Sequence, residues 1–493
     1  MIDQKGFGGY VGVIGTGRSI YVASLFILNI GLSRSLGPDG FGSFQQVFLL
    51  NIVIIIFCLG IPETMYFLLP RFSEEERPAF IRQTLCILAI AGTCVALILW
   101  FGASKIAGIQ NNPSIEPKLK LFGIYGAFII ASSFSDPVFI FFKRIKYLFI
   151  LSTLHGLFFI ILTAWQYLTE SSVMVLFIAM GVFGIFKFIL ALLFLFMISP
   201  KTVTTPLLSG KHNILLQLSF ALPIALTNSV DIISRWLDKF VISIFLGAEP
   251  LGVYYIGAIE LPFVSVFVAT VYSVISPVLN TFHLKEDYDG FVTLIRKTLK
   301  FTAKFVWPIC IFLFVFADHL IPLVFTSDYE GAVAPFRIYL SLMPIRIFLF
   351  GVIIIALGQP RIVLWAALGS LIVNFFLNIL LIIRIGFLGP AIATVISTYL
   401  QVIGLIWFIL ANLRIRISEL IPFQTLFDIG LTSLLAAVIA FLLTSAYAND
   451  LKVVLMSLTI FLSAYIFLGS RVGLFKILSV MDLLKGNFFG KKD

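Results

Sequence analysis

Four charged residues lie within one long apolar stretch of this sequence, at Asp231, Arg235, Asp238 and Lys239. A charge inside a membrane is costly, so such residues usually pair with one another or face a water-filled cavity. Asp231, Arg235 and Asp238 fall on one face of a helix, because helical neighbours are three or four residues apart. Lys239 lies one turn beyond Arg235. The stripe therefore fits either a self-neutralising ladder of ion pairs or a surface that faces a charged substrate.

Two further arginines lie deep within apolar stretches. Arg18 and Arg346 are each about ten residues from the ends of their predicted helices, which places both near the middle of a membrane by helix rise. A guanidinium at that depth can hold a phosphate through charge-assisted hydrogen bonds. We therefore predict that cations bind the substrate, at Arg18, Arg235, Lys239 and Arg346. Three other cations are predicted to extend from near a helix end towards water, namely Lys187, Lys304 and Arg337.

Acidic residues at membrane depth indicate a second kind of site. Glu63 follows Pro62, where a helix is expected to kink and to free backbone carbonyls. An acidic side chain at this position could cap the kinked helix, or it could bind a cation or a proton. We predict that Glu63, Asp231 and Asp238 couple ion movement to the activity of the protein.

Several motifs of catalysis and metal binding are absent from the sequence. There is no GxxxxGK[ST] phosphate loop, no GxSxG and no HExxH, and the four histidines are scattered. Asp287-Tyr288-Asp289 resembles a metal-nucleotide motif, but its charged neighbours favour a solvated run. The four cysteines lie in apolar runs without paired ligand spacing. We therefore predict no catalytic residue, no metal and no cofactor, and a protein that is not an enzyme.

The elements that must position these charges are membrane-spanning helices. The chain has 493 residues, of which 60% are hydrophobic and 12% charged, and its mean hydropathy is +1.09. Its apolar runs of about 20 residues are long enough to cross a bilayer, and we count about fourteen. They include Leu121 to Phe142, Ile214 to Leu246 and Phe336 to Leu357. The sequence therefore predicts an all-α integral membrane protein.

Basic residues indicate how the helices are oriented. Lys and Arg are several times more frequent in the loops on the side of the amino terminus than in the alternate loops. Because such residues mark the cytoplasmic side, both termini are predicted to be cytoplasmic. The same loops account for the net charge of +10, so we predict no nucleic-acid partner.

A repeated motif divides the predicted helices into two groups. The stretch from Ser33 to Phe44 recurs 210 residues later as Ser243 to Tyr254, with Leu-Gly, an acid, a second Gly and an aromatic in register. Two parallel six-helix lobes are therefore predicted, with two extra helices after them. The predicted boundaries are 1–211 for the N-terminal lobe, 212–418 for the C-terminal lobe, 419–474 for helices thirteen and fourteen, and 475–493 for a basic cytoplasmic tail.

Three stretches in sequence order resemble one family. Residues 33–42, SRSLGPDGFG, are similar to the "aRlLGpeeyG" signature at the first outer loop of Wzx-type polysaccharide flippases. Residues 246–254, which follow Asp238-Lys239, resemble the opening of that family's second lobe. Residues 374–394, with Asn374 and Asn378, resemble its "N..lN..li...G..GaaiaT" stretch. The chain is thereby identified as similar to the polysaccharide-transporter branch of the multidrug/oligosaccharidyl-lipid/polysaccharide superfamily.

This resemblance implies a function. Such proteins are flippases that move oligosaccharide units linked to polyprenyl pyrophosphate across the cytoplasmic (inner) membrane, for lipopolysaccharide O-antigen, capsule or exopolysaccharide assembly. Two lobes alternate access to a central cavity, and the last two helices are thought to form a groove for the lipid tail. The partners implied are the lipid-linked oligosaccharide, membrane lipid, a polysaccharide polymerase and glycosyltransferases.

Three alternatives stay open. A multidrug or cation antiporter of the same superfamily should favour an acidic cavity, whereas the charges at membrane depth lean basic here. A flippase for lipid-linked peptidoglycan precursors shares the same chemistry and is not separated by charge. A membrane polymerase or ligase usually needs a large outer loop, and the longest predicted one runs only from Ala103 to Lys120.

Overall fold

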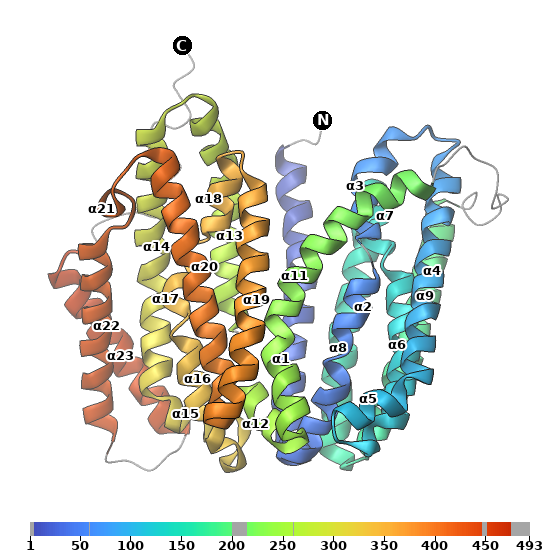
Figure 1. Cartoon of the computed structure of the whole chain (residues 1–493), viewed down its shortest axis with the longest axis horizontal. Helices are drawn as coiled ribbons and strands as arrows, with labels where there is room; N and C mark the ends of the chain where they lie inside the picture. The colour runs from blue at the N-terminus through green and yellow to red at the C-terminus, as the bar shows by residue number, and fades with distance from the viewer. Residues whose placement is uncertain (1–3, 59, 200–213, 260, 446–450, 475–493) are drawn as a thin grey trace. The chain divides into compact units, whose positions relative to one another are not determined.

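Long apolar helices make up the computed structural model (Figure 1). It describes residues 4–58, 60–199, 214–259, 261–445 and 451–474, without the side chains of residues 4–14, 18, 227, 231 and 262. These residues form two compact units, Met1–Val253 and Tyr254–Asp493, which are considered one at a time below. The predicted lobe boundary at 211 and the basic tail lie outside the described residues, so the predicted division into lobes stays a prediction.

The first unit contains α1 to α11 and the start of α12. Its elements are α1 Gln4–Phe48, α2 Asn51–Phe57, α3 Ile61–Leu68, η1 Leu69–Arg71, α4 Arg77–Phe101, α5 Ala103–Ile109, η2 Pro113–Ile115, α6 Glu116–Ser132, α7 Ser135–Phe141, α8 Ile145–Thr169, α9 Val173–Ile198, α11 Ile214–Leu246 and α12 Ala248–Gly257.

The second unit contains the remaining helices. They are α13 Pro262–Leu284, α14 Tyr288–Val315, α15 Ala317–Phe325, η3 Ser327–Ala332, α16 Val333–Leu340, α17 Met343–Arg346, α18 Phe350–Ala356, α19 Pro360–Ile385, η4 Gly386–Leu388, α20 Gly389–Leu413, α21 Ile417–Leu420, α22 Phe423–Thr444 and α23 Leu451–Arg471.

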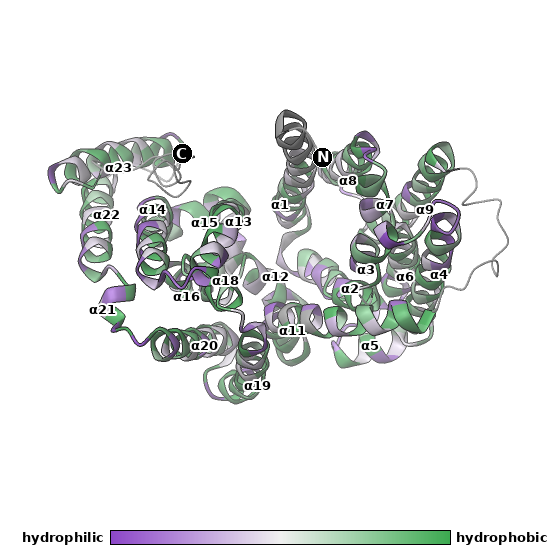
Figure 2. Ribbon diagram, turned by 90° about the horizontal axis from the view of Figure 1, so that it is seen from above, coloured by the Kyte–Doolittle hydropathy of each residue, from purple (hydrophilic) through white to green (hydrophobic). Residues whose placement is uncertain are grey.

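The composition of the helices suits a lipid environment. Figure 2 shows apolar residues along most helices and hydrophilic ones in short connections such as α21. Among the described residues, eleven segments are long and apolar enough to cross a membrane, or twelve with the bent helix α11. The predicted all-helical, multi-pass membrane fold is confirmed, whereas the predicted count of fourteen is not. One apolar segment of 54 residues contains both α19 and α20, and it is far longer than one crossing needs.

Prolines and glycines set several helix ends. Pro78, Pro117, Pro360 and Pro390 lie in the first turns of α4, α6, α19 and α20, where no intrahelical partner for the missing N–H is needed. Gly37 interrupts α1 with φ of 66° and ψ of 177°, a conformation that only glycine adopts without strain. The first membrane helix therefore ends at this kink.

The two copies of the repeated motif pack against each other within the first unit. A Cβ atom on Gly42 would lie 1.8 Å from the carbonyl oxygen of Ala248, and one on Gly252 would lie 2.2 Å from that of Pro38. Pro38 and Ala248 occupy the same position in their copies, as do Gly42 and Gly252. The contact is therefore reciprocal, as a local two-fold relation requires.

Packing of the last two helices closes the second unit. Ala436, Ala437 and Ala440 of α22 are buried against Phe312 of α14 and Phe316, the residue that follows α14, together with Phe461 and Tyr465 of α23. Small residues on α22 let the neighbouring backbones approach closely. The hydroxyl of Ser457 also donates to that of Thr444 at 2.9 Å, which joins α23 to α22. The last two helices are thus fixed to α14.

Candidate functional site

Helix α11 carries the predicted charged stripe. Asp238 is 1% exposed and Lys239 is 9% exposed. The Lys239 ammonium lies 3.5 Å from Oδ2 of Asp238 and donates to the backbone carbonyl of Arg235 at 3.3 Å. Ion pairing thus occurs within the stripe between neighbours in sequence, because the long lysine stem folds back along the helix.

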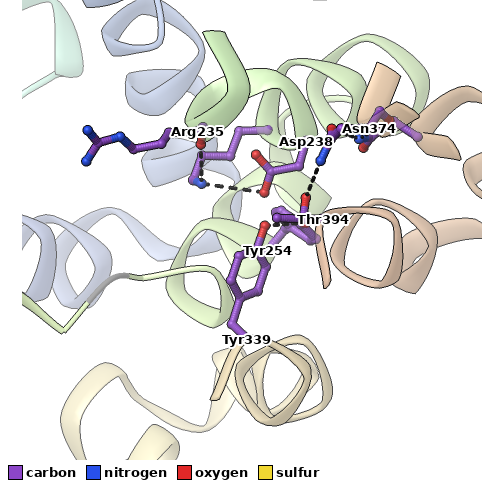
Figure 3. Close-up of polar contacts among 8 residues, drawn as sticks. Arg235, Asp238, Tyr254, Tyr339, Asn374 and Thr394 are labelled. Atoms are coloured by element: carbon purple, nitrogen blue, oxygen red, sulfur yellow. Dashed lines mark hydrogen bonds and ion pairs between the residues drawn. The ribbon is translucent and has the colours of Figure 1, made fainter. Parts of the chain in front are cut away.

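Arg235 is separate from this ion pair. Its side chain is exposed and points away from Asp238 (Figure 3). The side chains of Asp231 and Arg18 lie outside the described residues, so their predicted roles are not tested. Of the predicted binding cations whose side chains are described in the first unit, Arg235 is exposed and Lys239 is buried.

Arg346 lies at a break in a membrane segment. The predicted span from Phe336 to Leu357 consists of the short helices α16, α17 and α18, and Arg346 is the last residue of α17. It is half-buried. The sequence placed it in mid-helix, and this expectation is wrong. Pro344 supplies no backbone N–H, and the chain leaves the helical conformation at Leu349 with ψ of 65°.

Three aromatic side chains satisfy the backbone carbonyls that this break releases. Tyr399 donates to Ser341 at 2.9 Å, Trp307 to Pro344 at 3.4 Å and Tyr272 to Ile347 at 2.8 Å. These donors come from α20, α14 and α13. Because buried carbonyls without a partner are costly, the three bonds stabilise the non-helical path. These three donors could not be predicted from the sequence, since nothing in their spacing points to the break.

Glu63 lies in the first turn of α3, after the predicted interruption at Pro62. Its atom Oε2 is buried and has no hydrogen-bond partner among the described residues. A carboxylate is favoured there by the helix dipole. No group of three or more His, Cys, Asp or Glu residues that would suit a metal ion occurs in the part of the chain that the structure describes. The predicted ion-coupling role of Glu63 stays a prediction.

An asparagine pair joins α19 to α20 in the second unit. The amide of Asn374 donates to the hydroxyl of Ser397 at 2.8 Å and to that of Thr394 at 3.4 Å (Figure 3). Asn378 donates to the backbone carbonyl of Asn374 at 2.9 Å. Asn374 and Asn378 are buried, so the motif from 374 to 394 forms a polar seam inside an apolar pair of helices.

An apolar cavity lies beside the broken segment. It has a volume of about 590 Å³ and is bounded by parts of α14, α17, α18, α20 and α22. Its lining includes Trp307, Phe348, Phe350, Phe423 and Phe427. The lining is almost wholly apolar, which suits hydrocarbon and not sugar.

Comparison with known proteins places the chain in a family. Residues 32–334, more than half of the chain, match the model of the family described as polysaccharide biosynthesis protein. This chain belongs to that family. The resemblance that the sequence motifs indicate is thereby confirmed, and the matched region contains both copies of the repeated motif and the charged stripe of α11.

A curated relative and two solved structures are also similar. The chain is 27% identical over 165 residues to the probable low-salt glycan biosynthesis flippase Agl15 of Haloferax volcanii, a match that covers 33% of this chain and 35% of that protein. A lipid II flippase MurJ structure in an inward closed conformation has a TM-score of 0.70 at 16% identity, covering 94% of this chain and 99% of that one.

The second solved structure belongs to another transporter type. An inward-facing multidrug resistance MATE family transporter of the MOP superfamily has a TM-score of 0.64 at 13% identity, covering 80% of this chain and 95% of that one. At such low identities, both structures show a shared fold. The chain thus combines membership of a polysaccharide biosynthesis family with a fold that flippases and multidrug transporters use.

One expectation about the remaining cations is wrong. Lys187 is predicted to reach towards water from near a helix end, but it lies near the middle of α9 and its ammonium is 3.2 Å from Nδ1 of His155. Arg337, another of these cations, pairs with Asp318 and donates to the backbone carbonyl of Phe314 at 3.0 Å. The convergence of Arg18, Arg235, Lys239 and Arg346 on one cavity stays a prediction.

Proposed function

We propose that this protein is a flippase that moves oligosaccharide units linked to polyprenyl pyrophosphate across the cytoplasmic membrane. The observation that carries the proposal is the family match over residues 32–334, joined to a fold shared with a lipid II flippase over 94% of the chain. An all-helical fold with ion pairs and polar seams at membrane depth suits transport better than catalysis, so we propose a transporter and not an enzyme.

The apolar cavity supports the lipid part of this proposal. A polyprenyl chain needs an apolar surface, and the lining from Trp307 to Leu434 offers little else. Gly430 on α22 lies beside the Trp307 ring, where a Cβ atom would be 3.4 Å from Cζ3. We propose that the tail occupies this cavity while the sugars cross elsewhere in water.

The pyrophosphate is proposed to bind cations that can form several hydrogen bonds to phosphate oxygens. The residues proposed are Arg18, Arg235, Lys239 and Arg346, of which Arg235 is exposed and Lys239 is held by Asp238. Glu63, Asp231 and Asp238 are proposed to couple an ion gradient to the transport cycle. Both termini are proposed to be cytoplasmic, with O-antigen, capsule or exopolysaccharide as the final polymer and a polymerase and glycosyltransferases as partners.

Loss of the arginines tests the head-group site. In a strain that lacks this gene, Arg18→Ala and Arg346→Ala should each abolish the rescue of surface polymer, because the charged pyrophosphate would lose its hydrogen-bond donors. Polymer on the cell surface is measured by immunoblot alongside the amount of protein in the membrane. Lys105→Ala, which changes an exposed lysine of α5, is the matched control and should rescue fully. Normal export by both arginine variants would refute the assignment.

Filling the apolar cavity tests the tail site. Gly430→Leu places a larger side chain beside Trp307, so binding of a long polyprenyl diphosphate to purified protein should weaken by about tenfold, or roughly 1.4 kcal/mol. A short isoprenyl diphosphate that does not reach the cavity should bind equally to both proteins. Gly404→Leu on α20, where nothing lies within 4 Å of the added Cβ atom, is the control. Unchanged binding of the long ligand would remove the cavity from the proposal.

A second candidate is flipping of lipid-linked peptidoglycan precursors. The TM-score of 0.70 against a lipid II flippase favours this candidate over a multidrug antiporter, for which the score is 0.64. The two candidates separate when the protein is expressed in a strain depleted of its own lipid II flippase. Rescue of growth would favour the peptidoglycan precursor, whereas failure to rescue growth, together with restored surface polymer in the strain that lacks this gene, would favour the oligosaccharide.

A further inference from the structure

A buried chain of three titratable side chains crosses the first unit, apart from the residues proposed above. His155 of α8 is 5% exposed. Its Nδ1 atom lies 3.2 Å from the Lys187 ammonium of α9, and its Nε2 atom lies 3.1 Å from the Tyr125 hydroxyl of α6. Both ring nitrogens of the histidine are therefore occupied by polar partners inside a helical bundle.

Aromatic rings surround the histidine at the centre of these three side chains. The His155 ring lies 4.7 Å from the ring of Tyr21 on α1 and 5.1 Å from those of Phe159 and Phe183. The described titratable groups that face the chain are Tyr21, Tyr125 and Asp136, a residue of α7 whose charge acts on Lys187. One acid, one lysine and one histidine thus share an apolar setting where their charges are poorly screened.

The hydrogen bonds restrict where protons can sit. A charged lysine can only donate, so Nδ1 of His155 accepts from it while Nε2 carries the ring hydrogen and donates to Tyr125. A proton on Nδ1 requires a neutral lysine, because two positive charges 3.2 Å apart in an apolar interior repel strongly. Lys187 and His155 therefore hold either one positive charge between them or none.

We propose that Lys187 and His155, with Tyr125 as their hydrogen-bond acceptor, form a site for a single proton that is taken up when the anionic head group binds. Position 18 lies one turn before Tyr21 on α1, and Tyr21 contacts the His155 ring. A negative charge near Arg18 would therefore favour the charged form of the pair. This inference rests on the proposed function for the identity of the anion and for its binding near Arg18.

The test uses purified full-length protein in lipid nanodiscs and farnesyl diphosphate as the probe. Wild-type protein should take up protons from a weakly buffered solution when the probe binds, and its affinity should fall about tenfold from about pH 6 to about pH 9, within the usual range of coupling between sites. Lys187→Arg should bind the probe without proton uptake, because a guanidinium stays charged throughout. His319→Gln of α15 changes a histidine that is not one of the three side chains of the site, and it should behave as wild type.

Equal proton uptake by wild type and Lys187→Arg would overturn the proton site while leaving the flippase proposal intact. If the probe binds to neither protein, the proposed substrate class is wrong. The proton site is then tested in the absence of a ligand, by NMR titration of His155. In protein labelled with 15N-histidine, the signal assigned through His155→Gln should titrate in one step that is absent from Lys187→Arg. A His155 signal that does not change with pH, or that titrates identically in both proteins, would refute the site.

Discussion

The two copies of the repeated motif differ in what surrounds the final aromatic ring, which is Phe44 in the first copy and Tyr254 in the second. They share a backbone path. Gly37 and Gly247 occupy the same position and both have positive φ, at 66° and 90°. Phe44 stacks on Phe177 at 5.3 Å in an apolar core. Tyr254 instead places its hydroxyl 3.3 Å from that of Tyr339.

This difference shows which features of the repeat depend on the mutual contact. Gly42 and Gly252 make the contact between copies, so their size is constrained alike. Gly37 and Gly247 share a positive φ, so their backbone angles are constrained alike. The aromatic residues leave the contact and pack into separate surroundings, so their chemistry follows the local partners. A repeat in sequence therefore indicates equal backbone constraints, and it does not indicate equal side-chain environments.

The reciprocal glycine contact should give the largest effect. Gly42→Ala and Gly252→Ala each place a Cβ atom against a backbone carbonyl, at 1.8 Å and 2.2 Å respectively. A backbone carbonyl cannot move away as a flexible side chain would. Each variant should lose about 3 kcal/mol of stability, since overpacking forces the backbones apart. Thermal unfolding of purified protein in detergent measures the loss. A large loss in one variant and none in the other would break the symmetry of the contact.

Exchange of the aromatic residues should give an intermediate and unequal effect. Phe44→Tyr buries a hydroxyl in an apolar core, which costs about 1–3 kcal/mol when the hydroxyl finds no partner. Tyr254→Phe removes a hydroxyl from a pair and leaves Tyr339 with one partner fewer, so it should cost about 1 kcal/mol. The same unfolding experiment ranks the two. Equal costs would show that the two surroundings are alike.

Alanine at the positive-φ glycines should give the smallest effect. Nothing lies within 4 Å of a Cβ atom on Gly37 or Gly247, so only backbone strain opposes Gly37→Ala and Gly247→Ala, at about 1 kcal/mol each. Gly108→Ala in α5 is the control, because that glycine also has open space but an ordinary helical backbone. It should be neutral or slightly stabilising. If all three variants are equally stable, the positive φ at positions 37 and 247 does not affect the stability of the protein.

The ends of the long helices could be predicted from the sequence because their apolar length is enough to define them. Helix α11 spans Ile214–Leu246, as predicted, although the sequence did not predict the 43° bend between its two parts. The span predicted from Leu121 to Phe142 is instead divided into α6 and α7. Ser132 and Ser133 donate to their own helix at Ile129 and Ile130, and Pro137 follows within a turn. Hydropathy does not register such local competition for backbone carbonyls.

The candidate site could be predicted only as a set of residue types. Burial of Asp238 and Lys239 follows from their apolar neighbours, whereas the direction of a flexible lysine stem does not. His155 and Lys187 lie 32 residues apart on different helices, so their contact depends on how α8 packs against α9. The three donors at the break near Pro344 also come from separate helices. These features depend on tertiary packing, which no local pattern encodes.

The order of synthesis has a consequence for the apolar cavity. Trp307 and Phe350 belong to helices, and Phe348 to the connection between α17 and α18, that leave the ribosome before α22, which supplies Phe423 and Phe427. The lining of the cavity is therefore incomplete until α22 has been made and has packed against α14. A nascent chain can thus complete its charged stripe and its repeat contact before the walls of this apolar cavity exist.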